Sequence, residues 1–210
     1  MIDVHLPHGK LLGVKDFFLH LFTITIGLLI ALSLEGWVEH EHHQHLAHEA
    51  ESGLRAEIST NEHEMGHRRQ QITDQQTQAQ INLKTLAEMQ ANPQAKHGPL
   101  RIGGGMETFD NMSWKTAQTT GAISYMPYKD TQSFSDIYLM QDELYKLEMQ
   151  LVEEETNAAS LLISHPADDW VPTPEQADLE TDRIGRMQIR LIVLGNELDG
   201  LDKTYQRFES

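Results

Sequence analysis

The chain has 210 residues, no cysteine, 12 histidines, and 16 basic against 32 acidic side chains, so its formal net charge is −16. The missing cysteines exclude disulfides, thiolate zinc sites, iron–sulfur clusters and cysteine nucleophiles. The acidic excess argues against nucleic acid as a partner, and against anionic lipid headgroups as partners of the soluble part.

An apolar stretch at residues 17–38 predicts a transmembrane helix. At about 1.5 Å per residue it would be roughly 33 Å long, which matches a hydrocarbon core of about 30 Å. The alternative is a cleavable secretory signal, with Lys10 and Lys15 as its basic region and Ala31-Leu32-Ser33 as its cleavage site. The apolar run exceeds the usual signal core of about 7–15 residues, which favours a retained anchor.

The basic residues near this span predict its orientation. Lys10 and Lys15 precede it, whereas the first lysine or arginine after it is Arg55. The positive-inside bias then places residues 1–16 in the cytoplasm and residues 39–210 in the periplasm of a bacterium, with the span in the inner membrane.

Two features inside the span indicate contacts. Thr23, Gly27 and Ala31 recur every four residues and form a small-residue column, which favours packing against a partner helix. His20 lies one turn inside the membrane, where an ionisable group is either a ligand for a cofactor or a neutral histidine hydrogen-bonded within a helix pair.

Residues 39–90 contain no proline and predict a long helix, in which 39–57 form a neck rich in histidine and glutamate. Gly53 and Gly66 are the points at which this helix is expected to bend. An apolar column with a spacing of seven contains Ile58, Met65, Ile72, Ala79 and Leu86. The companion column is polar, with Asn61, Arg68, Gln75 and Asn82, so it is not a full coiled-coil core.

The rest of the chain alternates loops and helices. A glycine-rich loop over 91–112 leads to a short helix within 110–126, and Pro127 closes that helix. Heptad spacing predicts a helix over 131–164, a turn follows at 165–173, and Thr173 with Pro174 starts a last helix. The apolar seam of the last helix is Met187, Leu191, Leu194, Leu198, Leu201, Tyr205 and Phe208.

These elements predict an all-α protein without β-strands. One N-terminal transmembrane helix continues into a long helix, and residues 58–210 form an antiparallel helical bundle or coiled coil. Because one narrow seam per helix buries limited surface, association with a second copy is expected to complete the core.

Two stretches carry a family resemblance. The run TITIGLLIALSLEGW at residues 23–37, the acidic helix after it, and MSWKTAQTTGAISYMP at 112–127 resemble a family of uncharacterised bacterial single-pass membrane proteins. In that family a similar span precedes a helical extracytoplasmic region with a W-x-x-x-x-x-x-G element, here Trp114 and Gly121. The resemblance implies a fold and a location, but no activity and no catalytic residue. Trp114 and Gly121 are expected on one helix face, either as a partner-docking site or as a lid on one end of the bundle.

The histidines are the main candidates for chemistry. On a helix, the neck places His42, His45 and His48 near glutamates at spacings that can chelate zinc, copper or nickel. His63-Glu64-Met65-Gly66-His67 also matches the H-E-x-x-H pattern of zinc proteases, in a glutamine-rich helix without a substrate-binding strand. The alternative is a hydrated helix that becomes cationic as the pH falls.

The sequence therefore predicts a non-enzymatic bitopic membrane protein without a cofactor. It would act as a scaffold or accessory subunit, with other membrane subunits or a second copy as partners. The alternative is a metal-binding or metal- and pH-sensing module, with zinc hydrolysis at the HEMGH motif as its extreme. Other enzyme signatures, such as GxSxG, the dinucleotide fingerprint and the phosphate loop, are missing.

Overall fold

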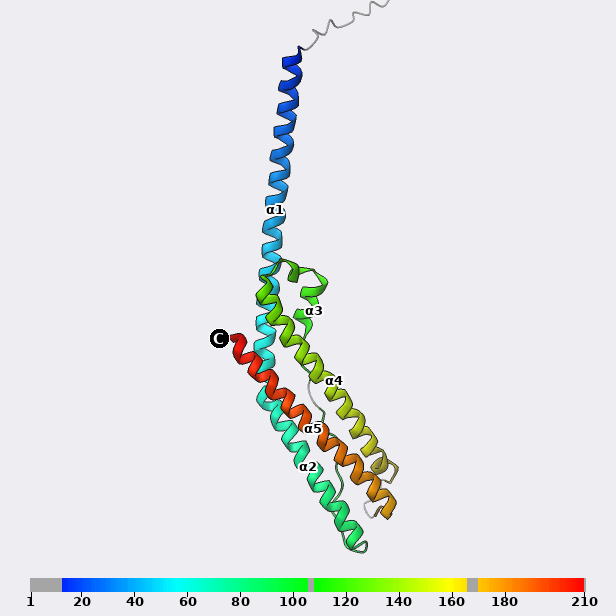
Figure 1. Cartoon of the computed structure of the whole chain (residues 1–210). Coiled ribbons are helices and arrows are strands. Elements are labelled where there is room, and N and C mark those ends of the chain that lie inside the picture. Colours follow the sequence, from blue (N-terminus) through cyan, green and yellow to red (C-terminus); the bar gives the residue numbers. More distant parts are fainter. Residues whose placement is uncertain (1–12, 106–107, 166–169, 210) are drawn as a thin grey trace, which may run out of the picture.

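The computed structural model describes residues 13–105, 108–165 and 170–209, and every regular element within these ranges is helical. The all-α prediction is confirmed. The elements are the helices α1 (Val14–His63), α2 (Met65–Ala91), α3 (Met112–Thr119), α4 (Tyr128–Ser164) and α5 (Pro174–Glu209), with a short 3₁₀ helix η1 (Ala122–Tyr125) before α4 (Figure 1). Lys10 and residues 166–169 of the turn predicted at 165–173 lie outside the described residues.

Helix α1 is unbroken from its apolar start into the folded region, as predicted (Figure 1). Its first half is long and apolar enough to cross a membrane, and no part of that stretch is buried by the rest of the chain. The hydroxyls of Thr23, Thr25 and Ser33 donate to carbonyls one turn earlier, at 2.9, 2.8 and 2.7 Å. These bonds satisfy the polar groups within the helix itself, as a lipid environment demands.

The long helix bends at Glu64, between α1 and α2, rather than at either predicted glycine. Gly66 lies one residue inside α2, and Gly53 stays within α1, where a Cβ atom would lie 3.6 Å from the Oγ atom of Ser113. Glu64 stays near the helical region, and its N–H reaches the carbonyl of Thr60 at a long 3.3 Å. The bend separates the part that packs on α3 and η1 from the part that packs on α5.

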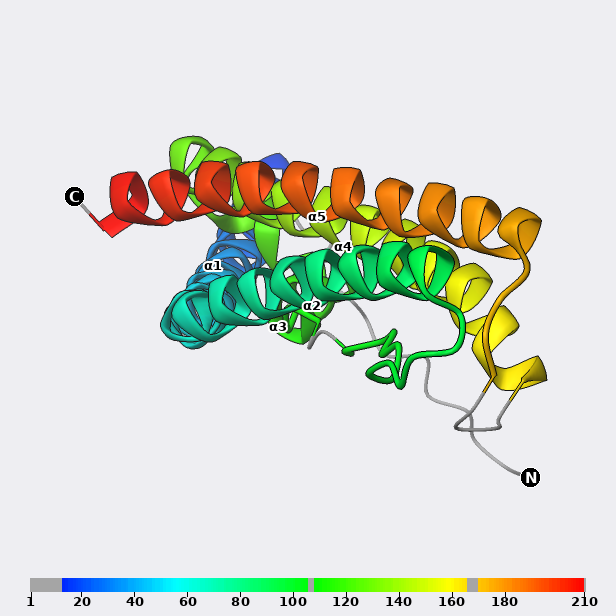
Figure 2. The ribbon, with the colours of Figure 1, turned by 90° about the horizontal axis from the view of Figure 1, so that it is seen from below.

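Helices α2, α4 and α5 form a three-helix bundle in which α5 packs on both of the others and runs antiparallel to them (Figures 1 and 2). Thr173 caps α5 as predicted, because its Oγ1 accepts the N–H of Gln176 at 3.3 Å. The α5 seam residues are at most 5 % exposed, except for the half-buried Phe208: Met187, Leu191, Leu194, Leu198, Leu201 and Tyr205. The apolar column of α1 and α2 is buried too: Ile58, Met65, Ile72, Ala79 and Leu86.

Residues 92–105 return from the far end of α2 along that helix, where Leu100 and Ile102 pack against the core between α2 and α5, and residues 108–111 lie beside the neck (Figure 2). The polar column predicted to interrupt a coiled coil holds this return segment. Asn82 bonds both backbone groups of Arg101, at 2.6 and 3.0 Å, and Gln75 donates to the carbonyl of Gly104. Nearer the neck, Asn61 bonds both backbone groups of Asp110, at 2.8 and 3.0 Å.

The fourth member of the column, Arg68, meets the return segment through a side chain. Its guanidinium lies 3.9 Å from the ring centroid of Phe109, which is 8 % exposed. The polar column therefore replaces a helix–helix seam by a contact between a helix and an extended segment.

The predicted helix over 110–126 is divided in two. α3 ends at Thr119, and Gly121 adopts a left-handed φ of 74° before η1 begins. Gly121 therefore lies past the end of α3, not on its face with Trp114. A Cβ atom there would meet nothing within 4 Å, so the glycine serves the turn and not the close approach of another backbone.

Replacing Asn61 by alanine should lower the free energy of unfolding by about 2 kcal/mol, because two hydrogen bonds to the backbone of Asp110 are lost. Urea unfolding of the full chain in mild detergent, followed by circular dichroism, measures this change. The matched control is Asn196→Ala, at an exposed position of α5. A loss at Asn61 no larger than that at Asn196 would show that the return segment does not depend on the column.

Candidate functional site

The apolar half of α1 is the largest exposed hydrophobic surface among the described residues. Phe18, Leu28 and Ile30 are 60 %, 59 % and 64 % exposed, and Trp37 at its end is 61 % exposed. Soluble monomers rarely present a contiguous apolar surface of this extent. The surface therefore requires an apolar environment outside the chain.

The predicted packing column Thr23, Gly27 and Ala31 lies on this surface and is exposed along its length. A Cβ atom at Gly27 would meet nothing within 4 Å, so the backbone is accessible there. His20, expected to be either an intramembrane ligand or a neutral hydrogen-bonded histidine, has its Nδ1 atom 2.9 Å from the carbonyl oxygen of Asp16 in the same helix. That contact leaves one ring nitrogen for any outside partner.

The neck histidines are spread around α1. His42, His45 and His48 are exposed, and His45 lies 3.2 Å from Glu49. His43 instead stacks on Tyr125 of η1, with ring centroids 3.8 Å apart. Within residues 13–105, 108–165 and 170–209, no three histidine, aspartate or glutamate side chains are grouped closely enough to hold a metal ion.

The HEMGH motif lies across the bend between α1 and α2. His63 ends α1, and both His63 and His67 are exposed. The Glu64 carboxylate lies 3.4 Å from the Nη2 atom of Arg68, and Met65 is buried at 2 % exposure. The motif's glutamate thus pairs with a buried arginine, and its Met65 belongs to the core.

A second cluster joins the neck to α3 and α4, and it contains the predicted docking residue Trp114. The indole of Trp114 stacks on Tyr138, with ring centroids 5.0 Å apart and planes at 7°. Tyr138 donates its hydroxyl proton to Glu57 at 2.6 Å, and the backbone N–H of Ser113 donates to the other oxygen of Glu57 at 2.7 Å. Burial, reinforced by the Glu57 carboxylate, raises the pKa of Tyr138.

Glu57 is 8 % exposed, so its carboxylate ties α3 and α4 to α1 from inside the fold. A buried carboxylate is tolerated when it is hydrogen-bonded, and both oxygens of Glu57 accept a hydrogen bond. Sequence reasoning did not find Glu57, because a lone glutamate in an acidic helix has the pattern of a solvated face.

Arg68 and Glu148 form a buried charged pair between α2 and α4. Their side chains are 1 % and 5 % exposed, and the Nη1 atom of Arg68 lies 3.8 Å from the Glu148 carboxylate. Among the described residues, Nη1 and Nε of Arg68 have no hydrogen-bond partner. Burial raises the pKa of Glu148 to about 7, against the opposing effect of Arg68.

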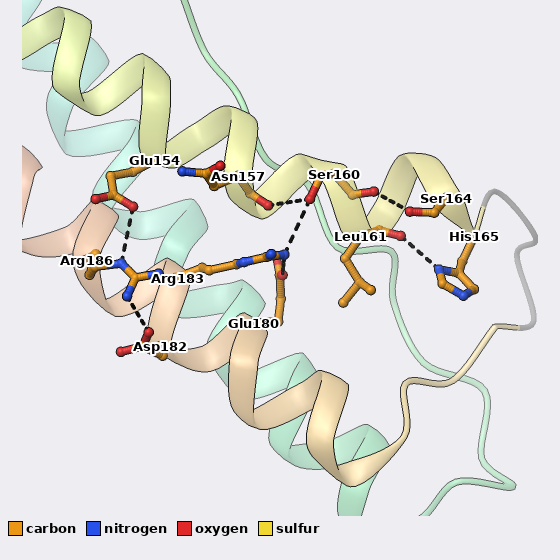
Figure 3. Close-up of polar contacts among 10 residues, drawn as sticks. All are labelled: Glu154, Asn157, Ser160, Leu161, Ser164, His165, Glu180, Asp182, Arg183 and Arg186. Atoms are coloured by element: carbon orange, nitrogen blue, oxygen red, sulfur yellow. Dashed lines mark hydrogen bonds and ion pairs between the residues drawn. The ribbon is translucent and has the colours of Figure 1, made fainter.

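The far end of the bundle is tied by polar contacts between α4 and α5 (Figure 3). Arg186 reaches Glu154 at 3.2 Å and Asp182 at 2.5 Å. Arg183 donates to Ser160 and to Glu180, both at 3.4 Å, and Glu180 is fully buried. Burial raises the pKa of Glu180, while Arg183 lowers it. The contacts from Arg186 to Glu154 and from Arg183 to Ser160 hold α4 and α5 together at this end of the bundle.

Comparison with known proteins adds no assignment: no protein-family model, no curated protein and no solved structure matches the chain.

The stability of the bundle should fall as the pH rises from about 5 to 8. Burial raises the pKa values of Glu148 and Glu155 to about 7, above their ordinary value of 4.5. The folded chain then holds these protons more tightly than the unfolded chain does. Their stabilising effect is complete below pH 4.5 and is lost as the pH passes 7, with each pKa unit worth about 1.4 kcal/mol.

Glu148→Gln should make the dependence of the unfolding free energy on pH shallower, because glutamine resembles the protonated acid at every pH. Urea unfolding across this pH range, followed by the fluorescence of Trp114 and the other tryptophans, measures the slope. Glu143→Gln, at an exposed position of the same helix, is the control and should retain the original slope. Equal slopes in the two variants would contradict the assignment.

Proposed function

We propose that the chain is a non-enzymatic bitopic membrane protein that acts as a scaffold or accessory subunit of a membrane assembly. One observation carries this proposal: α1 continues without a break from an exposed apolar half into the folded helices. A bilayer covers such a surface completely, and residues 17–38 have the length to cross it.

Basic residues near the span support one orientation. Lys15 lies at the start of α1 and Lys10 precedes it, while Arg55 is the first lysine or arginine on the other side. By the positive-inside bias the N-terminus is cytoplasmic. The helical bundle then lies in the periplasm of a bacterium, anchored in the inner membrane.

The exposed column Thr23, Gly27 and Ala31 supports the accessory role. Because these residues are small, two helices can approach closely along the column and gain van der Waals contact, which drives association in lipid. The partner helix belongs either to a second copy or to another membrane subunit. The folded part would hold that partner at a fixed place on the membrane.

Replacing Gly27 by leucine should disrupt this association, because the added side chain fills the open position on the helix face. The mass of the complex purified from its native membrane in mild detergent measures the effect. The native chain should exceed the 23.9 kDa of one copy, and Gly27→Leu should shift the mass towards it.

Gly36→Leu is the matched control, since nine residues at about 100° per residue place it on the opposite helix face. Its Cβ position is also open, and this variant should keep the native mass. A native chain that is a lone monomer, unaffected by Gly27→Leu, would defeat the proposal.

A metal-binding neck is the second candidate, favoured by the 3.2 Å contact between His45 and Glu49. An imidazole beside a carboxylate supplies two ligands, and the exposed pair His63 and His67 would supply a second position. This candidate predicts zinc, copper or nickel in the purified chain, with less in a His63→Ala/His67→Ala variant. Metal content no higher than in that variant would exclude the HEMGH position.

A further inference from the structure

The turn from η1 into α4 is the part of the folded region nearest to the apolar half of α1 (Figure 1). α3 runs back along α1 towards the membrane: Ser113, at its start, bonds Glu57, whereas Tyr125, after its end, stacks on His43. α4 then leads away again. We call residues 122–128 the membrane-proximal corner.

The height of this corner above the membrane follows from α1. The helix is unbroken between Val38, at the end of the predicted span, and His43. Five residues at about 1.5 Å each place His43 roughly 7.5 Å beyond the hydrocarbon core. The headgroup layer on each side of the core is about 5–7.5 Å thick. The ring stacked on His43 therefore lies at the outer edge of the headgroup layer.

The side chains at the corner suit that depth. Tyr128 is 83 % exposed and Tyr125 is 47 % exposed, although Tyr125 already stacks on His43. A tyrosine has an apolar ring and a polar hydroxyl, and such side chains concentrate at the boundary between lipid and water. The net charge of −16 does not oppose contact with a zwitterionic lipid, because the headgroup of such a lipid carries no net charge.

We infer that the membrane-proximal corner contacts the lipid headgroup layer through Tyr125 and Tyr128. This inference rests on the proposed span of residues 17–38. The contact gives the folded region a second attachment to the bilayer beside α1. Because Glu57, Tyr138 and Trp114 join the corner's helices to the neck, the attachment also sets the tilt of the bundle.

Site-directed spin labels can test this contact, because the chain contains no cysteine to interfere. Single cysteines would be labelled at Ser124 in the corner, at Leu29 in the apolar half of α1, and at Ile163 at the far end of α4, all of them exposed. The full chain is placed in phosphatidylcholine nanodiscs. The ratio of oxygen to nickel-chelate accessibility then reports the depth of each label.

The ratio at Ser124→Cys should be several-fold above that at Ile163→Cys and below that at Leu29→Cys. Tyr128→Ser in the Ser124→Cys background should lower the corner's ratio towards that of Ile163→Cys. This second variant leaves the stacked Tyr125 in place, so the fold of η1 is retained.

Four results overturn the inference. Equal ratios at Ser124→Cys and Ile163→Cys, with Leu29→Cys deep in lipid, reject the corner contact and leave the proposed span intact. Low accessibility to both reagents at Ser124→Cys indicates a protein partner instead of lipid. An unchanged ratio in the Tyr128→Ser variant removes Tyr128 from the contact. A water-exposed Leu29→Cys would instead reject the span itself, and the inference with it.

Discussion

The pairing of helix side chains with the backbone of the return segment is the constraint on which the rest of the structure depends. Asn61 and Asn82 each bond both backbone groups of one residue, and Gln75 and Arg68 contact the same segment between them. An amide side chain satisfies a free N–H and C=O pair, which an extended chain offers and a helix interior does not. The open face of α2 therefore accepts an extended segment where a fourth helix would otherwise pack.

The position of α3 and η1 follows from this pairing. Because the return segment is held by Asn82 of α2 at Arg101 and by Asn61 of α1 at Asp110, α3 begins beside the neck and not at the far end of the bundle. The Glu57 carboxylate then accepts hydrogen bonds from the first turn of α3 and from the hydroxyl of Tyr138, and the second bond holds α4 against α1. The membrane-proximal corner reaches the level of His43 because the contacts at Asp110 and Ser113 place α3 beside the neck before it, and the contact at Tyr138 holds α4 there after it.

Some of the acidic side chains are buried and make contacts inside the fold, while others are exposed to solvent. Glu57, Glu148 and Glu180 are at most 8 % exposed, and each meets a different partner: a tyrosine with a backbone N–H, an arginine across the bundle, and an arginine in the same helix. Glu57 has both oxygens bonded, whereas Glu148 has only a 3.8 Å ion pair, and burial raises the pKa of Glu148, which makes stability depend on pH. The free energy of unfolding of the bundle is thus expected to be highest at mildly acidic pH.

The sequence by itself determined the helices and their apolar faces, because these depend on local periodicity: the apolar start of α1, the seam from Met187 to Tyr205, and the cap at Thr173 were all readable. It also marked Asn61, Arg68, Gln75 and Asn82 as polar, but spacing alone could not say what they bind. Only the tertiary structure decided that they hold the return segment, that Glu57 and Glu148 are buried, and that the bend falls at Glu64. These outcomes depend on contacts between residues up to 81 positions apart, which no local pattern encodes.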